Sequence, residues 1–184
     1  MFVILEGPDG AGKTSFANAL AERVFTYTQH EPIRLHRGPI KESPLSEYLY
    51  CVDQVYRPGD NIHIICDRWH WGELIYGPLY RGRSQLTISE RYLIDQWLRT
   101  NGALIVHLTN IRDVLLKRHQ NTHEDFLKPE HVQHVIESYD DVAKTSIVNT
   151  ITYRDNHTMA DVNDVYTISS ILEAAAARNR KATR

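Results

Sequence analysis

The 184-residue chain has little cysteine, no long apolar run and no excess of basic charge. Its two cysteines, Cys51 and Cys66, lie in apolar segments, so we expect buried thiols of a reducing cytoplasm rather than a disulfide. No apolar run approaches membrane-spanning length, and Met1 and Phe2 lead directly into an apolar strand pattern. We therefore expect a cytoplasmic protein with neither a signal peptide nor a membrane segment.

The 21 lysine and arginine residues are balanced by 23 aspartate and glutamate residues, which gives a net charge of -2. Proteins that bind nucleic acid without sequence preference usually carry a basic surface. The balance disfavours that class, although it leaves room for a local basic groove. Because no repeat or low-complexity tract divides the chain, we expect a single domain over residues 1–184 with a sizeable buried core.

Strand and helix patterns alternate along most of the chain. Short apolar segments that favour strands occur at 2–6, 33–36, 62–66, 103–108 and 149–154. The last of these is less apolar, so we expect it nearer an edge of the sheet. Such alternation predicts an α/β fold of three layers, with a five-stranded parallel sheet covered by helices on both faces. In sheets of this kind, active sites lie at the carboxyl ends of the strands.

Capping residues mark the ends of the intervening helices. Thr87 and Glu90 have the spacing of a capping box, and the helix that they begin is predicted to end at Asn101. Other helices are predicted to begin after Ser43, Asn110, Pro129 and Asp161.

The segment GPDGAGKT at 7–14 fits the phosphate-binding pattern G-x-x-x-x-G-K-[ST], between a strand and a helix. Its glycines let backbone N–H groups turn inward toward an anion, next to the positive end of the helix. Lys13 can reach the β- and γ-phosphates of ATP, and the Thr14 hydroxyl can bind Mg²⁺. The residues predicted to bind ATP are Gly7, Gly10, Ala11, Gly12, Lys13, Thr14 and Ser15.

This loop occurs in switch GTPases and motor ATPases as well as in kinases. A GTPase would need a guanine-reading Asn-Lys-x-Asp sequence after a later strand, and HLTNIRD at 107–113 does not supply it. A motor would normally be longer. A small-molecule kinase is therefore the favoured class.

The segment CDRWHWGELIYGPLYRGR at 66–83 combines an Asp-Arg pair with four aromatic residues. Asp67 ends a predicted strand, where its carboxylate can hold Mg²⁺ through water or accept the proton of an attacking hydroxyl. Arg68 can bind the phosphate of an acceptor. The aromatic residues are interpreted as a stacking wall for a planar base, with about half of the rings facing the pocket: Trp69, Trp71, Tyr76 and Tyr80.

Three segments together resemble the thymidylate kinases and their nucleoside-kinase relatives. LEGPDGAGKT at 5–14 resembles the family's opening, and DRWHWGELIYG at 67–77 resembles its Asp-Arg-Tyr segment. ALIVHLTNIRDVLLKR at 103–118 is similar to its fourth strand and the following helix. The resemblance implies ATP with Mg²⁺, a contact from Asp9 to the acceptor's 3′-hydroxyl, a contact from Arg68 to its phosphate, and a mobile lid. It also leaves a homodimer open.

The sequence departs from this family on the acceptor side. Gly72 and Gly77 replace a serine and a glutamine that help to read thymine in the family, and the region before the third strand is short. The lid, at about 117–128, keeps Arg118 but lacks a second arginine. Arg118 is interpreted either as a catalytic arginine or as a helix-end cation. Arg37, after the second strand, is predicted to supply a phosphate contact.

The favoured function is an ATP- and Mg²⁺-dependent kinase acting on a deoxynucleoside monophosphate, with dTMP preferred. Lys13, Asp67, Arg68 and Arg118 are the predicted catalytic residues, and Thr14 and Asp67 the predicted metal ligands. One alternative is a kinase that acts on a nucleoside or on a hydroxymethylated pyrimidine in DNA. A non-enzymatic alternative is a regulatory module that binds nucleotide as a switch.

Overall fold

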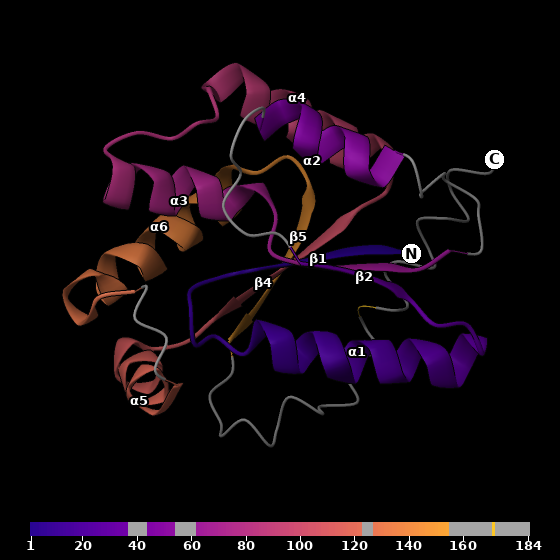
Figure 1. The fold of residues 1–184 in the computed structure, drawn as a ribbon, viewed down its shortest axis with the longest axis horizontal. Coiled ribbons are helices and arrows are strands. Elements are labelled where there is room, and N and C mark those ends of the chain that lie inside the picture. The colour runs from indigo at the N-terminus through magenta and orange to yellow at the C-terminus, as the bar shows by residue number, and fades with distance from the viewer. Residues whose placement is uncertain (37–43, 54–61, 123–126, 155–170, 172–184) are drawn as a thin grey trace.

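A computed structural model describes residues 1–36, 44–53, 62–122, 127–154 and 171 (Figure 1). Its five strands form one parallel sheet with the order β2-β3-β1-β4-β5, which confirms the predicted fold class. β3 and β4 begin one or two residues later than predicted, and β5 lies at an edge as expected. The strands are β1 (Phe2–Glu6), β2 (Ile33–His36), β3 (Ile64–Asp67), β4 (Leu104–Thr109) and β5 (Asn149–Arg154).

Helices cover both faces of the sheet. In Figure 1, α1 lies on one face, and α2, α3 and α4 lie on the other. The helices are α1 (Lys13–Thr28), α2 (Pro44–Asp53), α3 (His70–Arg81), α4 (Ile88–Thr100), α5 (Arg112–Thr122) and α6 (Val132–Thr145), with a 3₁₀ turn η1 (Pro129–His131). Within the described residues, no helix is long and apolar enough to span a membrane.

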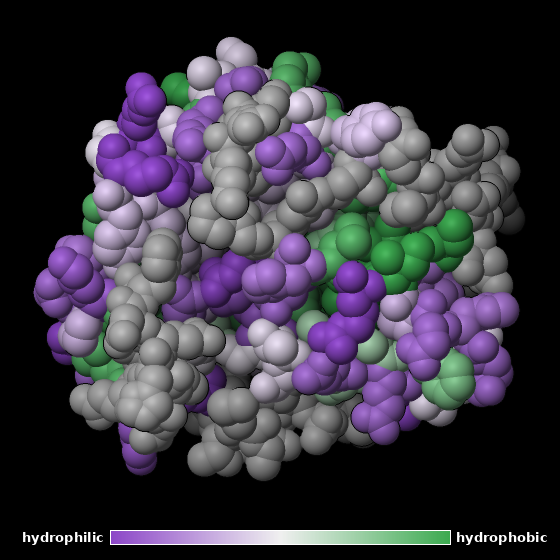
Figure 2. All heavy atoms as spheres, in the orientation of Figure 1, coloured by the Kyte–Doolittle hydropathy of each residue, from purple (hydrophilic) through white to green (hydrophobic). Residues whose placement is uncertain are grey.

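The three inner strands form the core. Every residue of β1, β3 and β4 is buried, whereas the edge strands β2 and β5 are mostly exposed or half-buried. Continuous apolar runs such as FVILE suit a strand that is covered on both faces. On the face shown in Figure 2, hydrophobic residues gather beside the beginnings of β1 and β2, away from the carboxyl ends of the strands.

The helix-end predictions have mixed outcomes. The capping box of α4 is confirmed: Thr87 Oγ1 accepts a hydrogen bond from the Glu90 N–H at 3.2 Å, and Glu90 Oε2 accepts one from the Thr87 N–H at 2.8 Å. Pro129 opens a 3₁₀ turn, and the α-helix begins only at Val132. Asn110 Oδ1 accepts from the Ile111 N–H, immediately before α5. α2 begins at Pro44, directly after Ser43 as predicted, whereas the helix predicted to begin at Asp161 starts outside the described residues.

The helix α3 was not predicted. Gly72, Gly77 and Pro78 lie within it, and these residue types normally weaken or break helices. The helix forms nevertheless because tertiary packing buries one side of it, including Trp71 and Ile75. Its position just after β3 brings the Asp-Arg pair to the carboxyl end of the sheet.

Candidate active site

The tight turn of the loop between β1 and α1 depends on backbone conformations that favour glycine. Gly7 has φ 148°, and a Cβ at this position would lie 1.9 Å from the Leu108 carbonyl oxygen of the neighbouring strand. Gly12 caps α1 with φ 87°. A side chain at either position would be strained, and at Gly7 it would also collide with β4. The sequence therefore fixes a tight backbone cradle at the positive end of α1, as anion binding requires.

Lys13 is folded back over this cradle. Its Nζ donates hydrogen bonds to the carbonyl oxygens of Gly7 at 2.8 Å and Pro8 at 2.6 Å, and the side chain is buried. Burial, aided by the charge of Arg68, lowers the pKa of Lys13 to about 8. The ammonium is therefore held at the cradle and can exchange loop carbonyls for phosphate oxygens.

Thr14 and Asp67 lie side by side although 53 positions separate them. The Thr14 hydroxyl donates to Asp67 Oδ2 at 2.8 Å, and His36 Nδ1 is 3.7 Å from the same oxygen. The other oxygen, Asp67 Oδ1, is buried without a hydrogen-bond partner in the described part of the chain. One carboxylate and one hydroxyl beside a phosphate cradle suit Mg²⁺, which keeps several water ligands and also binds substrate phosphates. The donor set fits the ion.

Asp9 and Arg68 form an ion pair across the cradle, through Asp9 Oδ1 and Arg68 Nη2. Tyr76 adds a third group, because its hydroxyl accepts a hydrogen bond from the Asp9 N–H at 3.2 Å. Burial would raise the pKa of Asp9, but the charges of Lys13 and Arg68 outweigh it and hold that pKa below its ordinary value. Asp9 is therefore an anion at neutral pH, as an acceptor of a hydroxyl proton must be.

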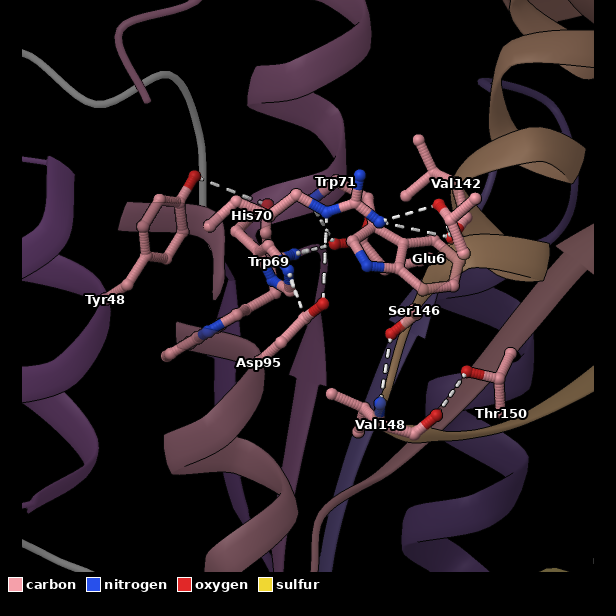
Figure 3. A network of polar contacts seen from close by, with 12 residues as sticks. Glu6, Tyr48, Trp69, His70, Trp71, Asp95, Val142, Ser146, Val148 and Thr150 are labelled. Atoms are coloured by element: carbon pink, nitrogen blue, oxygen red, sulfur yellow. Dashed lines mark hydrogen bonds and ion pairs between the residues drawn. The ribbon is translucent and has the colours of Figure 1, made fainter. Parts of the chain in front are cut away.

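Glu6 is a site residue that the sequence analysis missed. It ends β1, is fully buried, and accepts hydrogen bonds at Oε1 from the N–H groups of Trp69 at 3.0 Å and Trp71 at 2.9 Å (Figure 3). Burial raises its pKa to about 7, against the opposing influence of those N–H groups and of two nearby cations. A carboxyl group closing an otherwise apolar strand was the signal that could have identified it.

The two tryptophans lie in the core, which removes them from the predicted stacking wall and agrees with the expectation that only about half of the four rings face the pocket. Trp69 is 2% exposed and Trp71 0% exposed. Trp69 contacts the rings of Phe2 and Tyr48, and Trp71 contacts that of His107. Neither tryptophan has a free face in this structure. Trp69 therefore packs against β1 and α2, and Trp71 packs against β4.

Tyr76 and Tyr80 are placed differently. Tyr76 is buried beside Asp9, and its ring is nearly parallel to that of Tyr80, with centroids 6.2 Å apart. Tyr80 is half-buried, and its hydroxyl accepts a hydrogen bond from the Lys128 N–H at 3.3 Å. These two rings border the Asp9–Arg68 pair and the segment that precedes α6.

Arg118 reaches the cradle from α5. Its Nη1 donates to the Gly10 carbonyl oxygen at 3.3 Å and lies 4.0 Å from the Cβ position of Gly12. The structure therefore places this guanidinium against the phosphate loop rather than at an isolated helix end. Arg37 and residues 123–126 of the predicted lid lie outside the described residues.

Gly72 and Gly77 differ in how closely other groups approach them. A Cβ at Gly77 would lie 2.8 Å from Oε1 of the buried Glu73, which forms an ion pair with the exposed Arg81. A Cβ at Gly72 would lie 3.6 Å from the Tyr139 hydroxyl. The Tyr139 hydroxyl is buried without a hydrogen-bond partner among the described residues, and Tyr139 was also missed by the sequence analysis.

No family model matches the chain, and no curated protein matches it. Solved structures do match over nearly the whole length. The YorR protein from Bacillus subtilis, in complex with phosphorylated GDP, is 18% identical, with 94% of this chain and 97% of that chain covered and a TM-score of 0.70.

Two kinases have the same fold. Deoxyadenosine kinase from M. mycoides, with dCMP and a flexible dCDP bound, is 12% identical, with 92% and 98% coverage and a TM-score of 0.56. A gluconokinase from Sinorhizobium meliloti is 17% identical, with 99% and 93% coverage and a TM-score of 0.53. The chain therefore shares the α/β fold of these proteins, and at these identities the likeness shows the fold alone.

Proposed function

We propose that this protein is an ATP- and Mg²⁺-dependent kinase that phosphorylates a deoxynucleoside monophosphate, with dTMP favoured. The observation that carries the proposal is the arrangement of two pairs at one sheet edge. Thr14 and Asp67 are joined by a 2.8 Å hydrogen bond beside the phosphate cradle, and Asp9, within the loop, forms an ion pair with Arg68. One pair suits the donor's metal and phosphates, and the other suits an acceptor's hydroxyl and phosphate.

In this proposal an acceptor oxygen bonds to the γ-phosphorus while the bridging oxygen leaves with ADP. Lys13 would stabilise the charge that develops on the β- and γ-phosphates, and Arg118, which contacts the Gly10 carbonyl oxygen of the same loop, would add to this effect. Asp67 and Thr14 would hold Mg²⁺, which supplies further positive charge at these oxygens. Arg68 and Asp9 would orient the acceptor, since transfer depends mainly on positioning.

A nucleoside acceptor is the second candidate, and the Asp9–Arg68 ion pair favours it. An acceptor without a phosphate would leave that pair intact, whereas a monophosphate must draw the guanidinium away from Asp9. The alternative of a hydroxymethylated pyrimidine in DNA loses support, because the aromatic segment that suggested it places Trp69 and Trp71 in the core. A purely regulatory module would bind ATP without turnover.

An acceptor panel tests these readings. ADP release over many turnovers is measured with deoxynucleoside monophosphates, nucleosides and DNA that contains a modified base. The proposal predicts the highest kcat/KM for a monophosphate. Binding of ATP without release of ADP for any acceptor would instead support the regulatory module.

A 3′-deoxy acceptor sharpens the test. If Asp9 accepts a hydrogen bond from the 3′-hydroxyl, loss of that hydroxyl should lower kcat/KM about tenfold to a hundredfold. Asp9→Ala should remove most of the difference between the two acceptors. Equal use of both acceptors by the native protein, with efficient labelling of an internal base, would favour the DNA substrate. An internal nucleotide has no free 3′-hydroxyl.

A further inference from the structure

The turn that carries Arg68 has an unfavourable backbone conformation. Arg68 has φ 73°, in the left-handed region that residues with a Cβ seldom occupy. Such a conformation persists only where surrounding contacts hold it, and it often marks a functional position. Several contacts do so here: the Arg68 N–H donates to the Leu5 carbonyl oxygen at 2.9 Å, and Glu6 Oε1 accepts hydrogen bonds from the N–H groups of Trp69 and Trp71.

A buried His-Asp pair lies directly after this turn. His70 is the first residue of α3, and its Nε2 is 2.9 Å from Asp95 Oδ1 on α4 (Figure 3). The imidazole is 0% exposed and the Asp95 side chain 4% exposed. The two side chains therefore join the beginning of α3 to the middle of α4, two positions beyond Arg68.

The same carboxylate is connected to α6. Arg91 Nε lies 3.9 Å from Asp95 Oδ2, and Arg91 Nη2 donates to Thr145 Oγ1 at 2.9 Å. Arg91 Nη2 also lies 3.5 Å from the Val142 carbonyl oxygen. The pair is thus anchored through a cation to the helix that follows the lid. This anchoring leaves α4 little freedom to shift relative to the Arg68 turn.

The polarity of this pair suggests a role beyond filling space. Two apolar side chains of similar volume would occupy the same interior without the cost of removing polar groups from water. A hydrogen bond adds what apolar contact does not, a fixed direction between the imidazole and the carboxylate. That fixed direction holds the orientation of the first residue of α3. It thereby also influences the direction in which the Arg68 side chain leaves the backbone.

We propose that His70 and Asp95 are positioning residues that hold the Arg68 turn in the geometry required for acceptor binding. This inference rests on the proposed kinase function, in which Arg68 contacts the acceptor. Neither residue touches substrate. Burial lowers the pKa of His70 despite its hydrogen bond to Asp95, so the imidazole is neutral at pH 7 and donates from Nε2.

The test compares His70→Phe with His70→Gln. Phenylalanine keeps an aromatic ring but cannot donate to Asp95, whereas the glutamine amide can reach a similar position. The expected result is a rise of about tenfold in the acceptor KM for His70→Phe, with the ATP KM unchanged. His70→Gln should restore most of the loss. Val24→Ala, a buried truncation on α1, is the matched control for lost stability.

Amide hydrogen exchange supplies a readout that does not depend on activity. In His70→Phe, the Trp69 and Trp71 amides should exchange about tenfold faster relative to core amides of β1 and β4. Val24→Ala should leave this ratio unchanged. If His70→Phe does not fold, Asp95→Asn replaces it, with a smaller shift expected in both measurements because the amide oxygen still accepts from His70.

The outcomes separate the two proposals. A native protein that phosphorylates no acceptor overturns the proposed function, while the exchange ratio still tests the pair. An unchanged exchange ratio in His70→Phe overturns the positioning role whatever the activity. Equal changes in the ATP and acceptor constants, matching those of Val24→Ala, would reduce the pair to a contribution to stability and also overturn the role.

Discussion

The donor and acceptor sides of the candidate site are built differently. The donor side is a continuous loop, residues 7–14, whose backbone turns and one folded lysine create the phosphate cradle. The acceptor side is assembled from side chains on separate elements, with Asp9 in the loop, Arg68 after β3 and Tyr76 on α3. The geometry of the loop therefore depends mainly on its own sequence. The geometry of the acceptor side depends on how the whole fold brings Asp9, Arg68 and Tyr76 together.

This difference has a consequence for specificity. In the proposed function the donor cradle would bind phosphate oxygens that every nucleoside triphosphate carries, so it would constrain the reaction class more than the substrate. On the acceptor side, Glu73 occupies the space around Gly77, and Tyr139 faces Gly72. A side chain at position 77 would therefore require Glu73 to move, whereas a Cβ at position 72 would make only an ordinary van der Waals contact with Tyr139.

The largest expected effect comes from breaking the donor side. Lys13→Ala removes the cation that is held at the cradle, so kcat should fall at least about a thousandfold. The fold should persist, since the glycine turns remain. Turnover and far-ultraviolet circular dichroism measure the two effects. Lys117→Ala on the exposed surface of α5 is the control. Near-normal turnover in Lys13→Ala would exclude the kinase assignment.

Arg118→Ala tests whether the arginine beside the cradle takes part in chemistry. Its charge would matter as the phosphoryl group moves, so kcat should fall about a hundredfold with little change in the acceptor Kd. Single-turnover kinetics and acceptor titration separate these quantities. Arg112→Ala on the same helix, an exposed arginine, should have no effect. An unaltered kcat would make Arg118 a structural contact to Gly10.

The donor side could be predicted from the sequence better than the acceptor side, because the first is one continuous loop and the second is assembled from separate elements. The cradle could be predicted because its determining residues are neighbours in the chain, and the Thr14–Asp67 approach follows from where strands end in a parallel sheet. The tryptophans could not be placed, because α3 is obscured by Gly72, Gly77 and Pro78. Glu6 was missed for a further reason: a buried carboxyl depends on backbone partners brought from α3 by tertiary packing.

Glu6 joins the two sides, and its ionisation predicts a pH dependence of stability. Its folded pKa, about 7, exceeds the ordinary value of 4.5. The folded state therefore binds the extra proton, and this contribution to stability is complete below pH 4.5 and is lost as pH rises through 7. The loss corresponds to about 3 kcal/mol in the free energy of unfolding.

Urea unfolding of the native protein and Glu6→Gln from pH 4.5 to 8.5 measures this effect. The difference between the two curves isolates Glu6. His70 and His107, whose pKa values are lowered mainly by burial, contribute the opposite slope equally to both proteins. Glu6→Gln should gain stability relative to the native protein as pH rises. A pH-independent difference would mean that the Trp69 and Trp71 N–H groups keep Glu6 ionised throughout.

The smallest expected effect concerns the acceptor side. Arg68→Ala should raise the KM of a phosphorylated acceptor about tenfold and leave the ATP KM unchanged. The effect is limited because the acceptor phosphate must compete with Asp9 for the guanidinium that is lost. Burial opposes the charged form of Arg68, but Asp9 outweighs it and raises the Arg68 pKa, so the guanidinium stays charged throughout the assay range.

A nucleoside acceptor provides the internal control for Arg68→Ala. Without a phosphate it has no contact to lose, so its KM should change less than that of the monophosphate. Equal changes for both acceptors would indicate that Arg68 acts by fixing Asp9 rather than by binding phosphate. An unchanged KM for the monophosphate would make a nucleoside the favoured acceptor. The Asp9–Arg68 ion pair would then have a structural role and would not be a binding site for the acceptor's phosphate.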